Sequence, residues 1–317
     1  MRNFLLLLFA SCALAQPIAS IHAGVPTGAD LTARRAAFRH ALEVAERRPL
    51  AEFPAAARVF ADHPLAPYLD YAALRRQTDR ISAQTIKDFL DAHPDLPVAA
   101  ALRDQALRAL ARREDWSGFR TLYAGSADPE LRCADLLSRR TPAPDAAWLD
   151  AALALWQSGR SQPDRCNAVF DVLRQRALLT PERTRERIAL AAQEHNLGLM
   201  RYLARSLPAA QAKQVNGHAD FLASPSIARA AGWPNDAQSR QIALLGVIRL
   251  AKSDPSAAEI LLEALQKPLS FDAAQLGQAR HQIALWSAAS YLPESARRFA
   301  AVPPGAWDER LHEWHFR

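Results

Sequence analysis

The sequence has few side chains whose types and spacing could do chemistry. Its nine histidines are scattered, and only the C-terminal segment HEWHFR brings two of them close together, His312 and His315, one helical turn apart. With Glu309 and Glu313 nearby, this spacing could hold a metal ion, because imidazole and carboxylate groups are common metal ligands. The alternative is the polar side of a short amphipathic helix. We favour that alternative and expect no metal site.

The motifs that identify many enzyme classes are missing from the sequence. It has no Gly-rich dinucleotide or phosphate loop, no Gly-x-Ser-x-Gly elbow and no His-Glu-x-x-His zinc motif. Acidic residues are plentiful, yet none lies in an apolar, glycine-flanked setting that would raise its pKa for acid catalysis. We therefore expect no cofactor and no catalytic residue in this chain.

The N-terminus has the layout of a secretory signal peptide. Arg2 precedes an apolar stretch from Phe4 to Ala10, and small residues follow it. Candidate cleavage sites lie after Ala15 and after Ala23. The apolar run is too short to span a membrane, which takes about 20 residues. Residues 1–23 are therefore predicted to be a signal peptide.

Cys12 lies inside this leader and loosely resembles the lipid-bearing cysteine of a lipoprotein. Phe9 stands where such a signal usually has leucine, so removal of the leader is favoured over lipidation and an outer-membrane anchor. No other segment is apolar enough to cross a membrane. We expect the mature chain, residues 24–317, to be soluble and exported to the periplasm.

Once the leader is removed, two cysteines remain, Cys133 and Cys166. An even pair in an oxidising compartment indicates a disulfide. Closing a loop of about 33 residues would stabilise the fold by roughly 3–4 kcal/mol in the chain-entropy model. The alternative is two buried free thiols. A nucleophilic cysteine is disfavoured, because neither residue has a histidine close to it in the sequence.

The elements that must position these residues are helices. In the segment DLPVAAALRDQALRALARRED, Leu102, Ala106, Ala109 and Leu110 recur on one face of a helix. No stretch alternates apolar and polar residues with period two, so strands are not expected.

Start signals for helices recur along the chain. Thr180 and Asp254 each stand before a proline, which is the order of an N-cap followed by the first helical residue. Ser270 in LSFDAAQ is predicted to be another cap. The pattern predicts about fifteen helices of 8 to 20 residues.

Many short helices with tight turns favour an all-α superhelical solenoid of helix pairs over a bundle, which would use fewer and longer helices. No strict 34-residue repeat is present, so any repeats are degenerate. No Pro/Gly/Ser-rich linker interrupts the chain after residue 28, so one continuous domain over residues 24–317 is expected.

The formal net charge of +6 raises the question of an anionic partner. Basic residues are interspersed with acidic ones, as in ARREDW and PERTRERI, which is typical of a solvated helix surface. We therefore expect no nucleic-acid partner. Five tryptophans lie in helical segments among apolar neighbours, and core packing is favoured for them over stacking on sugars; they are Trp148, Trp156, Trp286, Trp307 and Trp314.

Three segments resemble one protein family. They are ADHPLAPYLDYAALRRQ (61–77), FLDAHPDLPVAAALRDQALRALARREDWSGF (89–119) and ALWQSGRSQPDRCNAVFDVLR (154–174). Their order, their spacing and the two cysteines are similar to the N-terminal part of soluble lytic murein transglycosylases, from about residue 30 to the end of the chain. The resemblance implies a U-shaped, TPR-like right-handed superhelix in the periplasm. It also implies that Cys133 and Cys166 bridge neighbouring helices and are structural.

The chain departs from this family where the catalysis resides. The family's lysozyme-like domain carries a Gln-Glu-Ser motif whose glutamate is the acid and base, followed by Gly-Leu-Met-Gln and Ala-Tyr-Asn-Ala-Gly. None of these is present. Glu294 precedes Ser295, but Pro293 replaces the glutamine, so the catalytic role is not transferred to Glu294. The chain resembles roughly the first half of such an enzyme.

Two functions follow from the resemblance. The first is the helical scaffold of a peptidoglycan lytic transglycosylase, inactive alone, with glycan strands as its partner and other cell-wall enzymes as further candidates. The second is a standalone, monomeric periplasmic solenoid that binds protein or peptidoglycan without cleaving it. A downstream reading frame that encodes Gln-Glu-Ser and Gly-Leu-Met-Gln would distinguish a split enzyme from a binding module.

Overall fold

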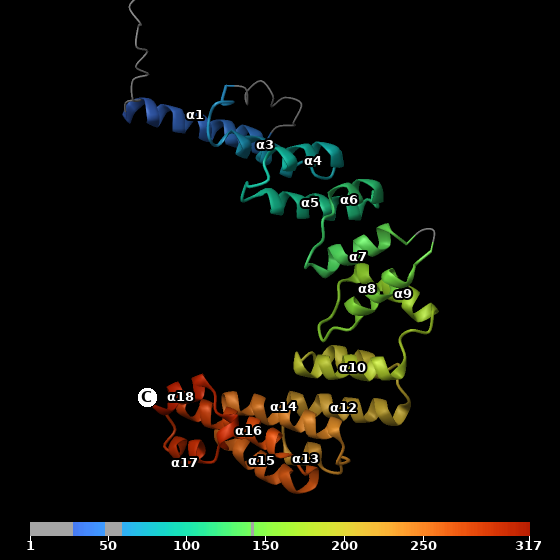
Figure 1. The fold of residues 1–317 in the computed structure, drawn as a ribbon, viewed down its shortest axis with the longest axis vertical. Helices are drawn as coiled ribbons and strands as arrows, with labels where there is room; N and C mark the ends of the chain where they lie inside the picture. The colour runs from blue at the N-terminus through green and yellow to red at the C-terminus, as the bar shows by residue number, and fades with distance from the viewer. Residues whose placement is uncertain (1–27, 48–58, 141–142) are drawn as a thin grey trace, which may run out of the picture. The chain divides into compact units, whose positions relative to one another are not determined.

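The computed structural model describes residues 28–47, 59–140 and 143–317, and every regular element in these ranges is a helix (Figure 1). Seventeen α-helices and two short 3-10 helices follow one another, with no strand among the described residues. The all-α prediction is confirmed. The helices outnumber the expected fifteen because elements as short as α13 (Ile227–Ala230) occur. The predicted signal peptide lies outside the described residues.

The described residues form two compact units, divided between Ala106 and Leu107. The first unit contains α1 (Gly28–Arg47), α3 (Ala66–Arg75), α4 (Ala83–Ala92) and the first part of α5 (Ala99–Arg112). The division does not test the single continuous domain expected from the sequence, which stays a prediction.

The core of the first unit lies between α1 and α3. Phe38 from α1 and Leu69 from α3 are buried there among alanines. The Phe38 ring also stacks on His63, with 4.5 Å between the ring centroids. On α5, the four apolar residues that the sequence placed on one face are all buried, which confirms that helix and its orientation; they are Leu102, Ala106, Ala109 and Leu110.

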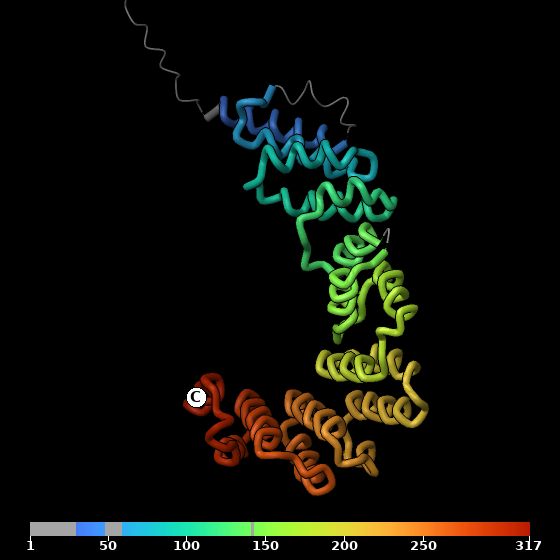
Figure 2. Tube along the Cα trace, turned by 45° about the vertical axis from the view of Figure 1, so that its right-hand side comes forward, coloured from blue at the N-terminus to red at the C-terminus, as the bar shows by residue number. Residues whose placement is uncertain are grey.

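The second unit stacks the remaining helices in chain order. They are α6 (Trp116–Leu122), α7 (Pro129–Ser138), α8 (Ala146–Trp156), η2 (Asp164–Cys166), α9 (Asn167–Gln175), α10 (Pro181–Gln193), α11 (Leu197–Ala204), α12 (Ala209–Ala223), α13, α14 (Ala237–Ser253), α15 (Pro255–Leu269), α16 (Ala273–Ala289), α17 (Ser295–Ala300), η3 (Pro304–Ala306) and α18 (Glu309–His315). Helices that are consecutive in the chain lie side by side, as in the pairs α10–α11, α11–α12 and α14–α15 (Figure 2). This arrangement is that of a superhelical solenoid, in which each helix pair buries its apolar face on its neighbours.

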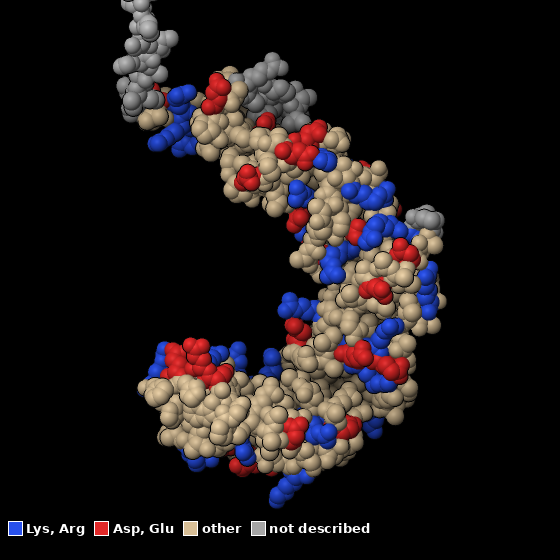
Figure 3. Space-filling model, viewed as in Figure 1, with Lys and Arg blue, Asp and Glu red and all other residues tan. Residues whose placement is uncertain are grey.

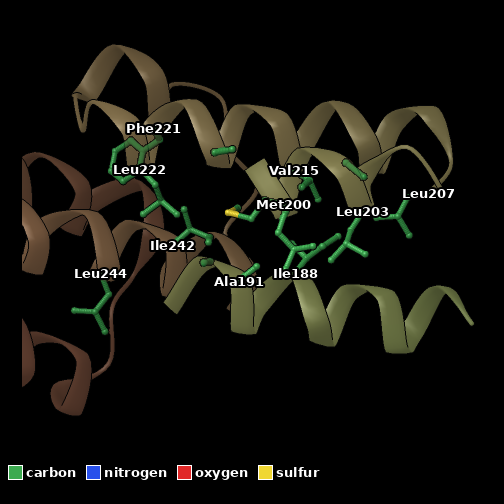
Figure 4. Close-up of a cluster of buried hydrophobic side chains, with 14 of the residues drawn as sticks. Ile188, Ala191, Met200, Leu203, Leu207, Val215, Phe221, Leu222, Ile242 and Leu244 are labelled. Atoms are coloured by element: carbon green, nitrogen blue, oxygen red, sulfur yellow. The ribbon is translucent and has the colours of Figure 1, made fainter. Parts of the chain in front are cut away.

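One continuous apolar core runs through the second unit from Cys133 to Ile283. In Figure 4, Ile188 from α10, Met200 from α11 and Val215 from α12 point toward one another. The apolar faces of these three helices are buried on one another, so none of them could bury its apolar face without its neighbour.

Capped starts explain where many of these helices begin. The side chains of Thr180 and Asp254 accept hydrogen bonds from the first turns of α10 and α15, as the sequence predicted. The prediction of Ser270 as a cap is wrong. Asp272 caps α16 in a capping box with Gln275, whereas Ser270 ends α15 in the left-handed conformation. Aspartate competes better for this role because its carboxylate also complements the positive N-terminal end of the helix.

Several helices end in a left-handed residue that is not glycine. Ala177 after α9 and Tyr291 after α16 have φ of 54° and 53°. The next amide donates back to the helix, from Leu178 to the Leu173 carbonyl at 2.9 Å and from Leu292 to the Ser287 carbonyl at 3.0 Å. These are Schellman turns, and they reverse the chain in one or two residues so that the next helix can pack on the last.

Charged side chains on the face seen in Figure 3 are mixed in sign. Many are paired along their own helix, as Lys87 is with Asp91 and Arg139 with Asp135. This mixture agrees with the solvated helix surface expected from the sequence.

Candidate functional site: two locked regions of the helical stack

The first locked region, the cystine region, comprises α7 to α10 (residues 129–193) and is built around a disulfide. Cys133 lies on the buried face of α7, and Cys166 ends η2; both are fully buried. The structure joins the two sulfurs, with 5.2 Å between the Cα atoms. The bond ties the start of α9 to α7, because α9 follows Cys166 directly.

The loop between α8 and η2 packs tightly on α10. A Cβ atom at Gly159 would lie 2.3 Å from the Leu190 carbonyl oxygen, so only glycine allows this approach. Leu190 is in α10, so the loop backbone rests directly on that helix. This contact could not be predicted from the sequence, because a single glycine in a turn has several structural explanations.

Side chains from α10 and α11 then hold this loop. Arg187 Nε donates to the Ser158 carbonyl at 3.1 Å. Asn196 Nδ2 donates to the Gly159 carbonyl at 3.4 Å and to Ser161 Oγ at 3.2 Å. A loop whose backbone carbonyls are satisfied in this way is a structural element, which fixes how α8 meets α10.

The second locked region, the arginine region, comprises α15 to α17 (residues 255–300) and is held by charge. Arg298 is 4 % exposed, and its three guanidinium nitrogens donate to Glu259 at 3.0 Å, to Ser287 Oγ at 2.7 Å and to Ser256 Oγ at 3.0 Å. Arg297 adds a bidentate pair to the same Glu259, both bonds at 2.8 Å. Three helices are thereby joined through one fully satisfied guanidinium.

This network determines the ionisation state of Glu259. Its hydrogen bonds with Arg297 are the main cause that holds the pKa of Glu259 below its ordinary value, and Arg298 adds to the effect. A cavity of about 320 Å³ adjoins the network. A carboxylate held ionised beside such a cavity cannot act as a general acid near neutral pH. Glu259 is therefore a structural anion.

Glu294 stands at the start of α17 with 47 % of its side chain exposed. Its carboxylate lies 3.9 Å from Arg298 Nη1. This carboxyl group therefore faces solvent and a guanidinium. The surroundings of Glu294 are thus the opposite of the apolar cleft that a catalytic acid requires.

His312 and His315 lie on α18 within an aromatic cluster. The His312 ring centroid is 4.9 Å from that of Trp307, and the His315 ring packs edge-on against Phe299 at 5.1 Å. Within the described ranges, no three histidine, cysteine or acidic side chains gather in a way that could hold a metal ion. The two histidines pack as aromatic rings on the last turns of the chain.

The five tryptophans divide into two groups. Trp148 and Trp156 are buried in the core, as predicted, and Trp148 Nε1 donates to the Leu136 carbonyl at 2.7 Å. The other three are partly buried and pack against apolar core clusters, which agrees with the predicted core packing; they are Trp286, Trp307 and Trp314.

The geometry therefore brings the two predicted cysteines together and leaves Glu294 and the histidine pair as separate surface features. The buried Arg298–Glu259 pair was missed by sequence reasoning. Its only signal was two adjacent arginines in ESARRF, a pattern that is common on exposed helices. Among the helices described, none is long and apolar enough to cross a membrane.

The sequence of this helical stack is similar to those of known proteins. No known protein-family model matches the chain. The soluble lytic murein transglycosylase of Escherichia coli K12 is 30 % identical over 232 residues, which are 70 % of this chain and 35 % of that protein. The Salmonella typhimurium protein of the same name is 31 % identical over 234 residues, 71 % of this chain and 35 % of that protein.

Solved structures give the same relationship. The 70-kDa soluble lytic transglycosylase from Escherichia coli superposes with a TM-score of 0.69 and 25 % identity, covering 86 % of this chain and 45 % of that one. An inactive mutant of the lytic transglycosylase Slt from Pseudomonas aeruginosa superposes with a TM-score of 0.65 and 28 % identity, covering 88 % of this chain and 46 % of that one. Both likenesses extend over most of the helical stack.

The fold is thus an all-α superhelical solenoid of short helices. The chain belongs to the soluble lytic murein transglycosylase family. It spans about a third of the length of the curated relatives it matches, 35 % in each case.

Proposed function

We propose that this chain is the helical scaffold of a periplasmic peptidoglycan lytic transglycosylase and that it does not cleave peptidoglycan by itself. The observation that carries the proposal is the likeness to two solved lytic transglycosylases over 86 % and 88 % of this chain. The scaffold would help to enclose or position the glycan strand. A catalytic domain outside these residues would carry out the reaction.

The reaction explains why a scaffold alone should be inactive. A lytic transglycosylase cleaves the β-1,4 bond between N-acetylmuramic acid and N-acetylglucosamine, and the C6 hydroxyl of the muramic residue closes a 1,6-anhydro ring. The leaving oxygen must be protonated by a carboxylic acid that is kept neutral in a partly apolar cleft. Glu259 is held ionised by two guanidiniums, and Glu294 is half exposed beside Arg298. Neither suits that role.

Incubation of the purified chain with purified sacculi tests the proposal. We expect no release of 1,6-anhydro muropeptides. Release that disappears in Glu294→Gln would assign the activity to that residue. Release that persists in Glu294→Gln would place an unrecognised acid within the helical stack. Either result would overturn the inactive-scaffold proposal.

The second candidate is a standalone periplasmic binding module, and the uninterrupted apolar core of the second unit favours it. Co-sedimentation with sacculi separates the two functions. A binding module is expected to pellet with sacculi in the absence of any catalytic domain. A scaffold is expected to stimulate or redirect cleavage when the catalytic domain of a relative is added.

Export is part of both candidates. We infer from the leader that the mature protein begins near residue 16 or residue 24. Mass spectrometry of periplasmic material should find one of these N-termini, and an intact Met1 would contradict export by this signal.

A further inference from the structure

A cavity of about 430 Å³ lies where the ends of four helices of the second unit meet. Trp156 ends α8, Arg174 lies near the end of α9, Thr184 is in the second turn of α10, and Tyr202 and Leu203 are on α11. Arg205 follows α11 at the rim. This volume and this mixture of aromatic, apolar and polar groups are those of a small-ligand site.

The charges that line this cavity are all positive. Its lining includes Arg174 and Arg205 and no carboxylate. Arg174 is bound to Asp171 on its own helix. Arg205 stacks on Tyr202, with its Cζ 4.7 Å from the ring centroid, and forms no ion pair with any residue that the structure describes. Its terminal nitrogens are therefore available to an anion.

A third guanidinium lies directly behind the aromatic wall. Arg187 is buried, with its Cζ 4.8 Å from the Trp156 ring and 5.7 Å from the Phe170 ring. Its Nε donates to the Ser158 carbonyl, and no carboxylate lies within ion-pair distance of it among the described residues. Burial lowers the pKa of Arg187 to about 10, as expected for a cation without a counter-charge.

Thr184 and the leucines complete the lining. Thr184 is buried in α10 but lines the cavity, and its hydroxyl makes no hydrogen bond to any described residue, so a ligand in the cavity can reach it. Leu179 and Leu203 give the cavity an apolar wall beside this hydroxyl. The site thus offers an unpartnered hydroxyl, an apolar wall and positive charge in one place.

We infer that this cavity binds a small organic carboxylate with an apolar body, of the class of an N-acylated amino acid or the C-terminal residue of a short peptide. The carboxylate would meet Arg205 and the Thr184 hydroxyl, and the apolar body would lie on Leu203 and the edge of Trp156. A bare inorganic anion would leave the apolar wall unfilled, and a neutral ligand would leave the Arg205 guanidinium unpaired.

The inference does not depend on the proposed function, because it concerns a soluble ligand and a cavity wholly within the second unit. Peptidoglycan carries short peptides that end in carboxylates, so the ligand class is compatible with that function. Binding of the probe and behaviour toward sacculi are separate measurements, and one can fail while the other succeeds.

The test uses three probes on the full mature chain. N-acetyl-leucine is the ligand probe, N-acetyl-leucinamide is its neutral counterpart, and inorganic phosphate is the bare anion. Titration is followed by calorimetry and by chemical shifts of the leucine methyl groups and indole N–H groups. The Trp156 signal is assigned with Trp156→Phe. We expect the acid to bind at least about tenfold more tightly than the amide, which is the usual effect of one charge-assisted hydrogen bond pair.

Matched variants locate the site. Arg205→Gln removes the unpaired rim charge and is expected to weaken binding of the acid about tenfold. Thr184→Val keeps the shape of the side chain, removes its hydroxyl and is expected to weaken binding about fivefold. Arg176→Gln removes one exposed positive charge from the neighbouring turn, outside the lining, and should leave the affinity unchanged. Circular dichroism checks that each variant is folded.

The inference is overturned by any of three results. The acid and the amide bind equally, Arg176→Gln weakens binding as much as Arg205→Gln, or phosphate competes as well as N-acetyl-leucine. Absence of binding at millimolar probe would overturn it as well. Binding of the acid alone, with loss in Arg205→Gln and shifts confined to the residues around Leu203 and Trp156, supports it.

Discussion

The cystine region and the arginine region solve the same structural problem with different chemistry. Each must fix the contacts between consecutive short helices that would not be stable alone. The first uses a covalent bond and close backbone contact at Gly159, whereas the second uses the buried guanidinium of Arg298. A disulfide restricts the unfolded chain and is indifferent to pH and salt, while an ionic lock depends on both. The two regions should therefore lose stability under different conditions.

Removal of the disulfide should have the largest effect. We expect Cys133→Ala combined with Cys166→Ala to lower the free energy of unfolding by about 3–4 kcal/mol, because the unfolded chain gains the freedom of a loop of about 33 residues. Urea unfolding of the variant and of the oxidised wild type measures this. Reduced wild type is the matched control and should resemble the variant. Equal stability of oxidised and reduced wild type, or two free thiols on alkylation of the native protein, would contradict the structural role.

Acid should weaken the segment between the two regions first. His218 on α12 is fully buried against Trp233, and its ring nitrogens make no hydrogen bond within the described residues. Burial lowers its pKa from 6.5 to about 4, against a smaller opposing effect of Asp236. Between these pH values the unfolded state binds more protons, so stability is complete above pH 6.5 and falls as the pH falls.

The loss from His218 by pH 4 should be about 3 kcal/mol, from the size of this pKa shift. His218→Phe keeps an aromatic ring against Trp233 and cannot titrate, so its stability should fall less than that of the wild type over this range, and His195, whose pKa burial also lowers, accounts for the rest. The loss of stability from Glu259 should begin only below pH 4.5, its ordinary pKa, because its pKa is lowered in the folded state. Urea unfolding at a series of pH values tests this order. A wild-type curve that is flat between pH 6.5 and 4.5 would show that His218 is not desolvated.

In the arginine region, the stabilisation by each arginine should depend more on the burial of its side chain than on the number of its hydrogen bonds. Arg298→Met leaves the buried Ser287 hydroxyl without its partner and removes one guanidinium from Glu259, and it should cost about 2 kcal/mol. Arg297→Met removes two hydrogen bonds to Glu259 from a side chain that is 61 % exposed, and its effect should be much smaller. Thermal unfolding of the two variants at low and high salt compares them directly. A larger loss in Arg297→Met would show that the exposed bidentate pair, and not the buried guanidinium, holds the arginine region.

Local signals in the sequence were enough for the helices and for the partners in the disulfide. A cap before a proline and an apolar stripe act over a few residues, so Thr180, Asp254 and the buried face of α5 could be predicted. The cap of α16 was misassigned because Ser270 and Asp272 are both acceptable caps, and the choice depends on how α15 ends.

The contacts that lock the stack could not be predicted from the sequence. Gly159 meets the backbone of Leu190, and Arg298 meets Ser256, each more than thirty positions away along the chain. Neither pairing leaves a local pattern, since a glycine in a turn and an arginine in a helix look ordinary. The same holds for the cavity, where Arg205 and Thr184 come from separate helices. Long-range packing decides these features, and one sequence does not reveal it.

The smallest expected effect concerns a feature that both regions share, a helix that ends in a left-handed residue other than glycine. Ala177 ends α9 in the cystine region, and Tyr291 ends α16 in the arginine region, each with φ above 50°. A side chain in this conformation is strained, and glycine relieves the strain while making the unfolded chain more flexible. We expect Ala177→Gly and Tyr291→Gly each to raise the free energy of unfolding by about 0.5–1 kcal/mol. The Tyr291 ring is 84 % exposed, so its loss removes little packing. If only one variant gains stability in urea, the turn in the other region is held by contacts of its side chain, and the two regions differ in their turns as well as in their locks.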